Sequence, residues 1–365
     1  MIWMRRFIAG MAAAFLAAVL VFPCTAISAR SAILLDGPTG RILYEKDADK
    51  QRLIASTTKI MTALIICEQT NVLDRVRIPQ EAVGIEGSSM YLKAGEVLTV
   101  QQLLYGLMLH SGNDAAVALA IYCSGTVEGF AELMNDKAHR LGLHNTHFVN
   151  PNGLDSPGHY STARDMAVLA AYAMENPIFA QTVSTKSVTV GDRILRNHNK
   201  LLWLLEGADG VKTGFTKAAG RILVSSCTRQ GRRLIAVTMN DGNDWNDHQQ
   251  LMENGFSNFS VRQIVRRGDC LGTMQIISGE SECVELLAET DFSYALAYGE
   301  NPEIVFAEPG FVYAPVVQGQ EAGVAYVCLD GKPIGKVPLV FGQTIEINTA
   351  KEPSLWEKLL KGGKS

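Results

Sequence analysis

The sequence lacks an excess of positive charge, since 33 Lys and Arg residues face 37 Asp and Glu residues, for a formal net charge of −4. Without a basic surface for phosphates, nucleic acid is not an expected partner. Only one stretch, at the very start, is apolar enough to span a bilayer, which excludes a multi-span membrane protein. Charged residues are few (19%) and apolar residues many (47%), which excludes a disordered chain. The 365 residues predict about two globular domains.

The sequence also lacks short motifs that mark several enzyme and metal-binding classes. It contains no G-x-S-x-G segment, which disfavours an α/β-hydrolase. Its seven cysteines form no CxxC pair, so neither a zinc knuckle nor a dense disulfide scaffold is indicated. Cys67 and Cys123 lie in apolar helical patterns, where buried free thiols are expected.

Two groups of residues that could bind metal lack the spacing of known sites. They are His139, His144 and His147, and Asp241, Asp244 and Asp247. The histidines match neither H-E-x-x-H nor a zinc finger, and the aspartates lack the closing Glu of an EF-hand. We therefore expect surface histidines, a solvated acidic loop, no metal and no cofactor.

The N-terminus has the parts of a secretory signal peptide. Arg5 and Arg6 precede the apolar run Phe7 to Phe22, and small residues follow up to Ala29. This pattern predicts a signal peptide over residues 1–29 and a protein outside the cytoplasm. An uncleaved membrane anchor is the alternative. A lipidated Cys24 is disfavoured, because the residues before it do not fit a lipoprotein signal.

The rest of the chain changes character near residue 260. Strands are expected over residues 31–35, 41–44, 187–190, 221–228 and 233–239, and helices over residues 56–69, 100–109, 114–122, 127–141 and 162–174. A strand pair, a mostly helical insert and returning strands predict an α+β domain over residues 30–260, whose sheet takes strands from both ends. Residues 261–348 predict a small all-β domain, and residues 349–365 form a tail.

The segment Ser56-Thr57-Thr58-Lys59 stands at the start of a predicted helix. Residues three apart share a helix face, so the Ser56 hydroxyl and the Lys59 amine are expected to meet. The positive helix N-terminus disfavours an ammonium there and favours an amine that acts as a base. A serine hydroxyl needs such a base to attack a carbonyl. Taken alone the pattern is weak, because a helix cap followed by a solvated lysine has the same spacing.

Two further short motifs follow in order. Ser111 and Asn113 frame a glycine between two helical runs, where a hydroxyl could relay a proton and an amide could hold a peptide backbone. The triplet Lys212, Thr213 and Gly214 opens a strand-like run. Its cation and hydroxyl could grip a carboxylate, and its glycine leaves room along the strand edge. Each motif alone is also ordinary cap or loop chemistry.

The three motifs together resemble the signature set of serine penicillin-binding proteins and class A β-lactamases. Wider segments resemble the serine D-alanyl-D-alanine carboxypeptidases, which are low-molecular-mass penicillin-binding proteins. These segments are residues 54–62, 110–115, 148–154, 160–166 and 210–216. The resemblance covers about residues 30–260 and, more loosely, the β-rich part and the tail.

The resemblance implies a role for each motif residue. Ser56 would be the acylated nucleophile, Lys59 its general base and Ser111 a proton relay. Asn113 would position substrate, and an oxyanion hole would come from the backbone amides of Ser56 and Phe215. The carboxylate grip would consist of Lys212 and Thr213, beside Gly214.

The resemblance also implies the architecture and the partners. The expected fold is a penicillin-binding-protein or β-lactamase-like α+β domain, a mixed sheet with a helical cluster, followed by a small all-β domain. The expected partners are peptidoglycan stem peptides ending in D-Ala-D-Ala, β-lactam antibiotics and a membrane surface. The expected location is the outer face of the cytoplasmic membrane.

Three other functions stay open at the sequence level. A class A β-lactamase needs a Glu-x-x-Leu-Asn segment for deacylation, and none lies between Asn113 and Lys212. A cross-linking transpeptidase shares the same motifs. A wall-binding or penicillin-sequestering protein without turnover is disfavoured, because every motif position is intact.

The tail carries an amphipathic pattern over residues 354–361. Its apolar residues fall on one helical face, and they are Leu355, Trp356, Leu359 and Leu360. Lys358 and Lys361 could reach anionic head groups, and a tryptophan suits the membrane interface. Packing of the same residues on the β-rich domain is the alternative.

Overall fold

A five-stranded antiparallel sheet forms the centre of the N-terminal domain in this computed structural model, which describes residues 26–306 and 310–349. Its strands are β1 (Ser31–Asp36), β2 (Ile42–Lys46), β7 (Ala208–Thr216), β8 (Gly220–Arg229) and β9 (Arg232–Met239). They lie in the order β2-β1-β9-β8-β7, with β1 bonded to β9. The sheet therefore takes strands from both ends of the domain, as predicted, and β7 is an edge strand.

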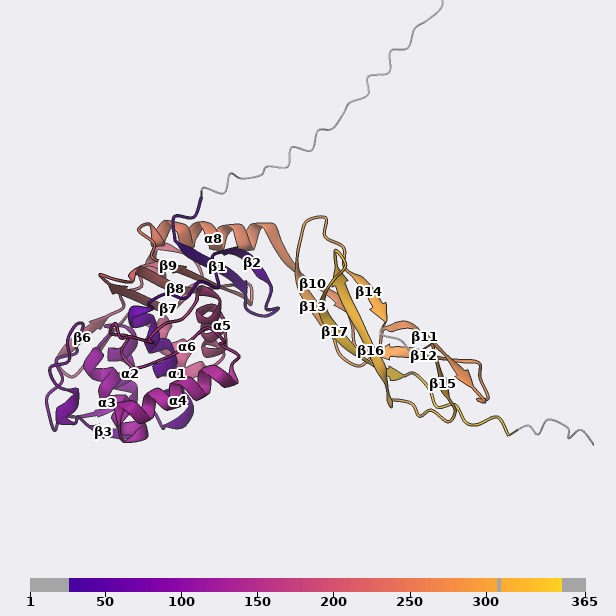
Figure 1. Ribbon diagram of the computed structural model, residues 1–365, viewed down its shortest axis with the longest axis horizontal. Helices are drawn as coiled ribbons and strands as arrows, with labels where there is room; N and C mark the ends of the chain where they lie inside the picture. The colour runs from indigo at the N-terminus through magenta and orange to yellow at the C-terminus, as the bar shows by residue number, and fades with distance from the viewer. Residues whose placement is uncertain (1–25, 307–309, 350–365) are drawn as a thin grey trace, which may run out of the picture.

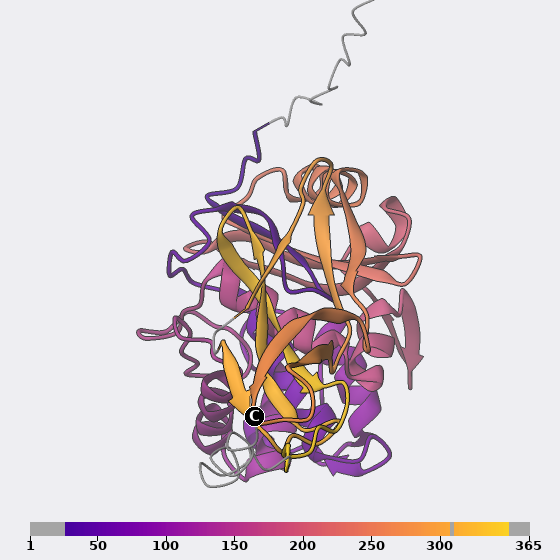
Figure 2. The same cartoon turned by 90° about the vertical axis from the view of Figure 1, so that its right-hand side faces the viewer.

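Helices cover both faces of this sheet (Figure 1). They are α1 (Lys59–Gln69), α2 (Val100–Met108), α3 (Asn113–Ser124), α4 (Val127–Arg140), α5 (Ala163–Met174), α6 (Pro177–Ser184), α7 (Leu201–Leu204) and α8 (Asp244–Asn258). The first six pack as a cluster against one face, and α8 crosses the other (Figure 2). The predicted helices are present with shifted ends, whereas α6, α7 and α8 were not predicted.

Short elements lie at the rim of the helical cluster. They are the hairpins β3 (Arg75–Arg77) with β4 (Val97–Thr99) and β5 (Ser187–Val190) with β6 (Arg193–Arg196), and the 3₁₀ turns η1 (Ala55–Thr58) and η2 (Gln80–Ala82). The turn η1 leads directly into α1, and β7 packs beside it. The start of α1 thus faces the open edge of the sheet.

The prediction of a solvated acidic loop is wrong. Asp241, Asp244 and Asp247 are buried, with 1%, 2% and 2% of their surface exposed. Asp244 pairs with Arg221, and the other two accept hydrogen bonds from Ser28. Residues 240–247 are mostly Asn and Asp, so the sequence shows no apolar periodicity that would predict the start of α8.

The start of the described chain belongs to the core. Ile27 and Ala29 are buried, with 2% and 0% of their surface exposed, and they pack in the cluster beneath α8. Cleavage after Ala29, at the predicted end of the signal peptide, would remove both contacts. The packing therefore favours a signal-peptide cleavage position earlier in the chain than Ala29.

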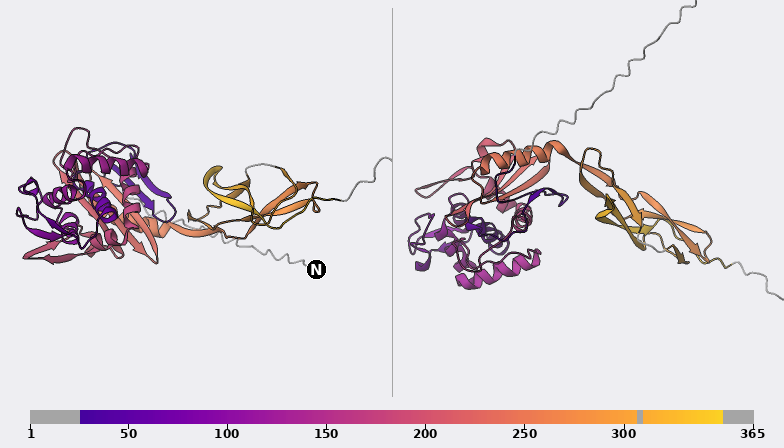
Figure 3. Two further views of the ribbon diagram at one scale, coloured as in Figure 1. Left: turned by 90° about the horizontal axis from the view of Figure 1, so that it is seen from below. Right: turned by 45° about the horizontal axis from the view of Figure 1, so that its top comes forward.

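The C-terminal domain consists of strands, in agreement with the predicted all-β domain. A two-stranded ribbon of β10 (Phe259–Val265) and β13 (Phe292–Ala297) accompanies a six-stranded sheet in the order β14-β16-β17-β12-β11-β15. Its strands are β14 (Glu303–Phe306), β16 (Glu321–Leu329), β17 (Lys332–Phe341), β12 (Cys283–Ala288), β11 (Cys270–Ile277) and β15 (Phe311–Tyr313). Only β11 and β15 pair in parallel among the described strands. The domain lies beyond the end of α8, as Figure 3 shows from two further sides.

Arg41 links the two domains. Its guanidinium bonds both carboxylate oxygens of Glu300, at 2.6 and 2.7 Å, and the carbonyl of Ala295. It also lies over the rings of Phe259 and Tyr294. The bidentate pair lowers the pKa of Glu300 and fixes the guanidinium plane.

Other predictions concern features away from the sheet. Cys67 is buried, as expected, and burial raises its pKa to about 12, whereas Cys123 is only partly buried. The proposed tail helix and the signal peptide up to residue 25 lie outside the described residues. Within the described ranges no single helix is long and apolar enough to span a membrane. The helices α3 and α4, which meet at an angle of 83°, reach that length and apolar composition only together.

Candidate active site

Ser56 lies in the turn η1, immediately before α1. A 3₁₀ turn replaces the first helical turn that was predicted, and its three residues per turn place residues i and i+3 in line. Ser56 Oγ is accordingly 3.0 Å from Lys59 Nζ, as the spacing predicted. Ala55 enters the turn with a left-handed backbone (φ 45°), a conformation that costs energy for a residue with a side chain.

Lys59 is completely buried at the start of α1, with 0% of its surface exposed. Burial first, and then the nearby charge of Lys212, lower its pKa well below the usual lysine value. The amine contacts Asn113 Oδ1 at 2.7 Å and the carbonyl of Asn152. A neutral amine has two hydrogens for these two oxygens and a lone pair for the Ser56 hydroxyl. Burial and these contacts therefore favour the neutral form of the Lys59 amine, which a general base requires.

Asn152 was not singled out as a functional residue, although it lies in a segment that carried the family resemblance. Its carbonyl reaches Lys59 because the following residue, Gly153, has φ 84° and packs against η1. A Cβ on Gly153 would lie 1.9 Å from the Ala55 carbonyl oxygen. The glycine thus permits the close approach that brings the Asn152 carbonyl to Lys59.

Asn113 holds Lys59 in this structure. Its Oδ1 accepts from the lysine, and its Nδ2 donates to the carbonyl of Glu86 at 2.5 Å. A Cβ on Gly87 would lie 2.8 Å from that Nδ2, so the loop can close over Asn113 only with glycine there. The predicted contact of Asn113 with substrate remains a prediction.

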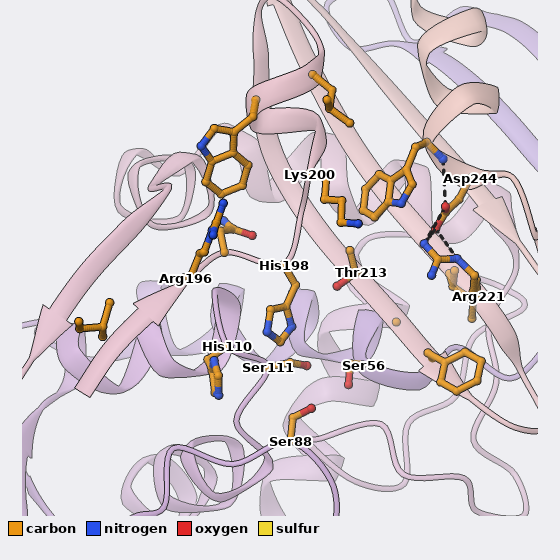
Figure 4. Close-up of a pocket in the computed structure, with 18 residues that line it drawn as sticks. Ser56, Ser88, His110, Ser111, Arg196, His198, Lys200, Thr213, Arg221 and Asp244 are labelled. Carbon is orange, nitrogen blue, oxygen red and sulfur yellow. Dashed lines mark hydrogen bonds and ion pairs between the residues drawn. The ribbon is translucent and has the colours of Figure 1, made fainter. Parts of the chain in front are cut away.

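Ser111 lies between α2 and α3 and lines the same cavity as Ser56 (Figure 4). It is only 4% exposed and has φ 64°, a left-handed backbone that a serine adopts at a cost. Such strain is retained where the surroundings over-determine the position of a side chain. In Figure 4 the hydroxyl of Ser111 points toward Ser56.

The third motif lies on the edge strand β7. Lys212 is 1% exposed, donates to the carbonyl of Thr213 at 2.9 Å, and has its pKa lowered to about 7 by burial. A Cβ on Gly214 would lie 3.2 Å from the Thr57 amide nitrogen, so glycine lets β7 pack against η1. Phe215 is 64% exposed at the cavity. An edge strand offers free backbone groups to an extended peptide.

The three motifs meet at a cavity of about 860 Å³. Its wall also carries residues that were not predicted as functional: Ser88, His110, Arg196, His198, Lys200, Trp203 and Trp245. The rings of His110 and His198 are 5.2 Å apart, and burial and the charge of Lys212 lower the pKa of His198 to about 4. These wall residues come from widely separated parts of the sequence. Of them, only His110 lies in a segment (residues 110–115) that carried the family resemblance.

The predicted surface histidines His139, His144 and His147 are exposed. Over residues 26–306 and 310–349 no group of three or more His, Cys, Asp or Glu side chains could hold a metal ion.

Comparisons with known proteins agree with this geometry. Residues 18–243 match the family described as D-alanyl-D-alanine carboxypeptidase, and residues 259–347 match the penicillin-binding protein 5 C-terminal domain. The chain is 33% identical to D-alanyl-D-alanine carboxypeptidase DacF of Bacillus subtilis, covering 85% of this chain and 84% of that protein. It is also 33% identical to DacC of Escherichia coli, over 94% and 92% of the two chains.

Solved structures show the same relationship. Penicillin-binding protein 5 of Haemophilus influenzae superposes with a TM-score of 0.77 and 32% identity, covering 88% of this chain and 98% of that one. The Streptomyces K15 DD-transpeptidase matches with a TM-score of 0.60 and 37% identity, over 63% and 98%. Both domains are thus matched, and the chain belongs to the D-alanyl-D-alanine carboxypeptidase family of low-molecular-mass penicillin-binding proteins.

Proposed function

We propose that this protein is a serine carboxypeptidase that removes the terminal D-alanine from peptidoglycan stem peptides ending in D-Ala-D-Ala. The observation that carries the proposal is the 3.0 Å approach of Ser56 Oγ to the buried amine of Lys59, beside the open edge of β7. A hydroxyl next to a neutral amine is an activated nucleophile.

In the proposed reaction, Ser56 Oγ attacks the carbonyl of the penultimate D-alanine while its proton passes to Lys59. The backbone amides of Ser56 and Phe215 would stabilise the oxyanion. Collapse of the tetrahedral intermediate breaks the C–N bond, and Ser111 relays a proton to the departing amine. Free D-alanine leaves, and water then hydrolyses the acyl ester and returns the hydroxyl of Ser56.

The remaining motif residues would hold the substrate. Lys212 and Thr213 would bind the terminal carboxylate, and the peptide would lie along β7 past Gly214 and Phe215. Asn113, released in part from Lys59, would contact the peptide backbone on the acyl side.

The same acylation step explains penicillin binding. A β-lactam carbonyl would acylate Ser56 in place of the peptide. The chain has no Glu-x-x-Leu-Asn segment to activate a deacylating water, so the penicilloyl ester should persist, unlike in a β-lactamase.

A D-Ala-D-Ala pentapeptide incubated with the enzyme tests the proposal. Mass spectrometry should show free D-alanine and the shortened tetrapeptide. A cross-linked product as the main species would indicate a transpeptidase, and unchanged peptide would indicate a binding protein without turnover.

Lys212→Ala should mainly weaken recognition of the terminal carboxylate. A charge-assisted contact contributes roughly 1.5–3 kcal/mol, or about one to two orders of magnitude in kcat/KM. Substrates without the carboxylate should lose much less. Lys217→Ala, at an exposed position in the turn between β7 and β8, is the matched control. An equal loss on both substrates would assign Lys212 to proton transfer at Ser56 instead.

The membrane-facing location is proposed from the tail sequence. Residues 354–361 would form a short amphipathic helix on the outer face of the cytoplasmic membrane, so binding should be weak and salt-sensitive. Signal-free protein should co-sediment with anionic liposomes at low salt, and a form ending at residue 352 should not. If both forms stay in the supernatant, the tail is no anchor.

A further inference from the structure

Two buried carboxylates at the start of α8, those of Asp241 and Asp247, have no ion-pair partner among the described residues. Asp241 and Asp247 are 1% and 2% exposed, and no lysine, arginine or histidine of the described chain forms an ion pair with either. The neighbouring Asp244 differs, because it has Arg221. Buried charges without a partner are costly, so a missing cation is indicated.

The hydrogen bonds around these carboxylates leave one acceptor unused. Asp241 Oδ1 accepts from Ser28 Oγ at 2.7 Å, but Asp241 Oδ2 is buried and has no hydrogen-bond partner. The next residue after Asp247, His248, bonds Ser225 and Thr238, and burial lowers its pKa to about 3, so its ring is neutral. The cation must come from elsewhere.

The segment that covers the two carboxylates is the start of the described chain. The Ser28 amide donates to Asp247 Oδ2 at 2.6 Å, and the Ser28 hydroxyl reaches Asp247 Oδ2 at 2.9 Å. Ile27 is anchored as well, with its side chain in the core and its carbonyl accepting from Lys46 Nζ at 2.8 Å. Ala26, one residue earlier, is exposed.

The anchoring of Ser28 limits how far one particular nitrogen can lie from the carboxylate of Asp247. The backbone nitrogen of Ile27 is one residue before the Ser28 amide, within ~3.8 Å of it by chain geometry. As a peptide nitrogen it is neutral. As a chain terminus it would be an ammonium with three hydrogens, one residue before the amide that donates to Asp247.

We propose that the signal peptide is cut between Ala26 and Ile27, and that the new α-ammonium of Ile27 pairs with Asp241 and Asp247. A membrane-bound signal peptidase would catalyse hydrolysis of this peptide bond by water, which leaves a carboxylate on Ala26 and an ammonium on Ile27. The sequence Cys24-Thr25-Ala26 supplies the small residues that such peptidases require. Processing and folding are then coupled, because the cut creates the cation that the catalytic domain lacks.

The first test is the mass of the processed protein. The full chain is expressed with its own leader in a bacterial host, and the exported form is analysed by intact mass and N-terminal peptide mapping. A chain beginning at Ile27 is expected. A start at any other residue, or an uncut leader, would overturn the proposal.

The second test separates the ammonium from the Ile27 side chain. Two otherwise identical chains are prepared by cleavage of a fusion partner, one beginning at Ile27 and one keeping Thr25 and Ala26. Urea unfolding followed by tryptophan fluorescence should show an about tenfold lower folding constant for the longer chain, because its ammonium is moved away from the carboxylates.

The same comparison in variants identifies the partners. In Asp241→Asn and in Asp247→Asn the cost of the two extra residues should fall from about tenfold to about threefold, since one of the two charges that pair with the ammonium is gone. Asp192→Asn, at an exposed turn between β5 and β6, should keep the full cost. An equal cost in all three variants, or no cost in the parent chain, would contradict the ion pair. D-alanine release plays no part in this readout.

Discussion

Ser56→Ala should release no D-alanine from a pentapeptide and take no covalent label from a fluorescent penicillin. The alanine has no oxygen to attack a carbonyl, and the other hydroxyls that line the cavity, those of Ser88, Ser111 and Thr213, form no hydrogen bond with Lys59 in the structure. Loss of a nucleophile typically removes all but a residual acceleration that substrate binding and the oxyanion hole supply. Labelling gels and D-alanine release on the same preparation measure both effects.

Ser56→Ala should leave the fold intact, because the hydroxyl contacts only Lys59 among the described residues. Thermal unfolding should change by no more than a few degrees. Ser187→Ala, at an exposed position on β5, serves as the matched control and should label fully. Penicillin labelling that survives in Ser56→Ala would refute the assignment of the nucleophile.

Lys59→Ala should reduce acylation by about 10²- to 10⁴-fold, the usual cost of losing a general base. Lys59→Arg should be similarly inactive, since a guanidinium keeps its proton at neutral pH. This pair of variants separates charge from basicity: a structural cation would be replaced in part by arginine, and a base would not. Acylation rates with a chromogenic β-lactam supply the measurement.

The pH dependence of the wild-type enzyme should follow the two buried lysines. The pKa of Lys59 lies well below its usual value, which favours the neutral amine, and acylation should be lost as the pH falls through that lowered value. The pKa of Lys212 is lowered to about 7, so the cation is lost as the pH rises. KM for carboxylate substrates should therefore increase above about pH 7, whereas acylation by neutral esters should not decline there. Identical alkaline limbs for both substrates would argue against Lys212 as the carboxylate grip.

The sequence by itself predicted the catalytic motifs and much of the framework around them. The approach of Ser56 to Lys59 follows from their spacing on one short turn, and the strands and longer helices follow from local periodicity. These features depend on residues within a few positions of one another. Even the pairing of the first strand with the last could be anticipated from the order of the elements.

Only the tertiary structure decided what surrounds those residues. The carbonyl of Asn152 meets Lys59 across 93 positions and Asn113 meets it across 54, and the burial that lowers the pKa of the amine exists only after the sheet and helices have packed. The sequence argument assigned that shift to a helix end, whereas burial is its main cause. Likewise Asp241 and Asp247 look like solvated loop residues in a polar run, but both are buried at the start of α8, where they accept hydrogen bonds from Ser28. Charge and hydrogen-bonding capacity belong to single residues, while desolvation depends on which distant segments enclose them.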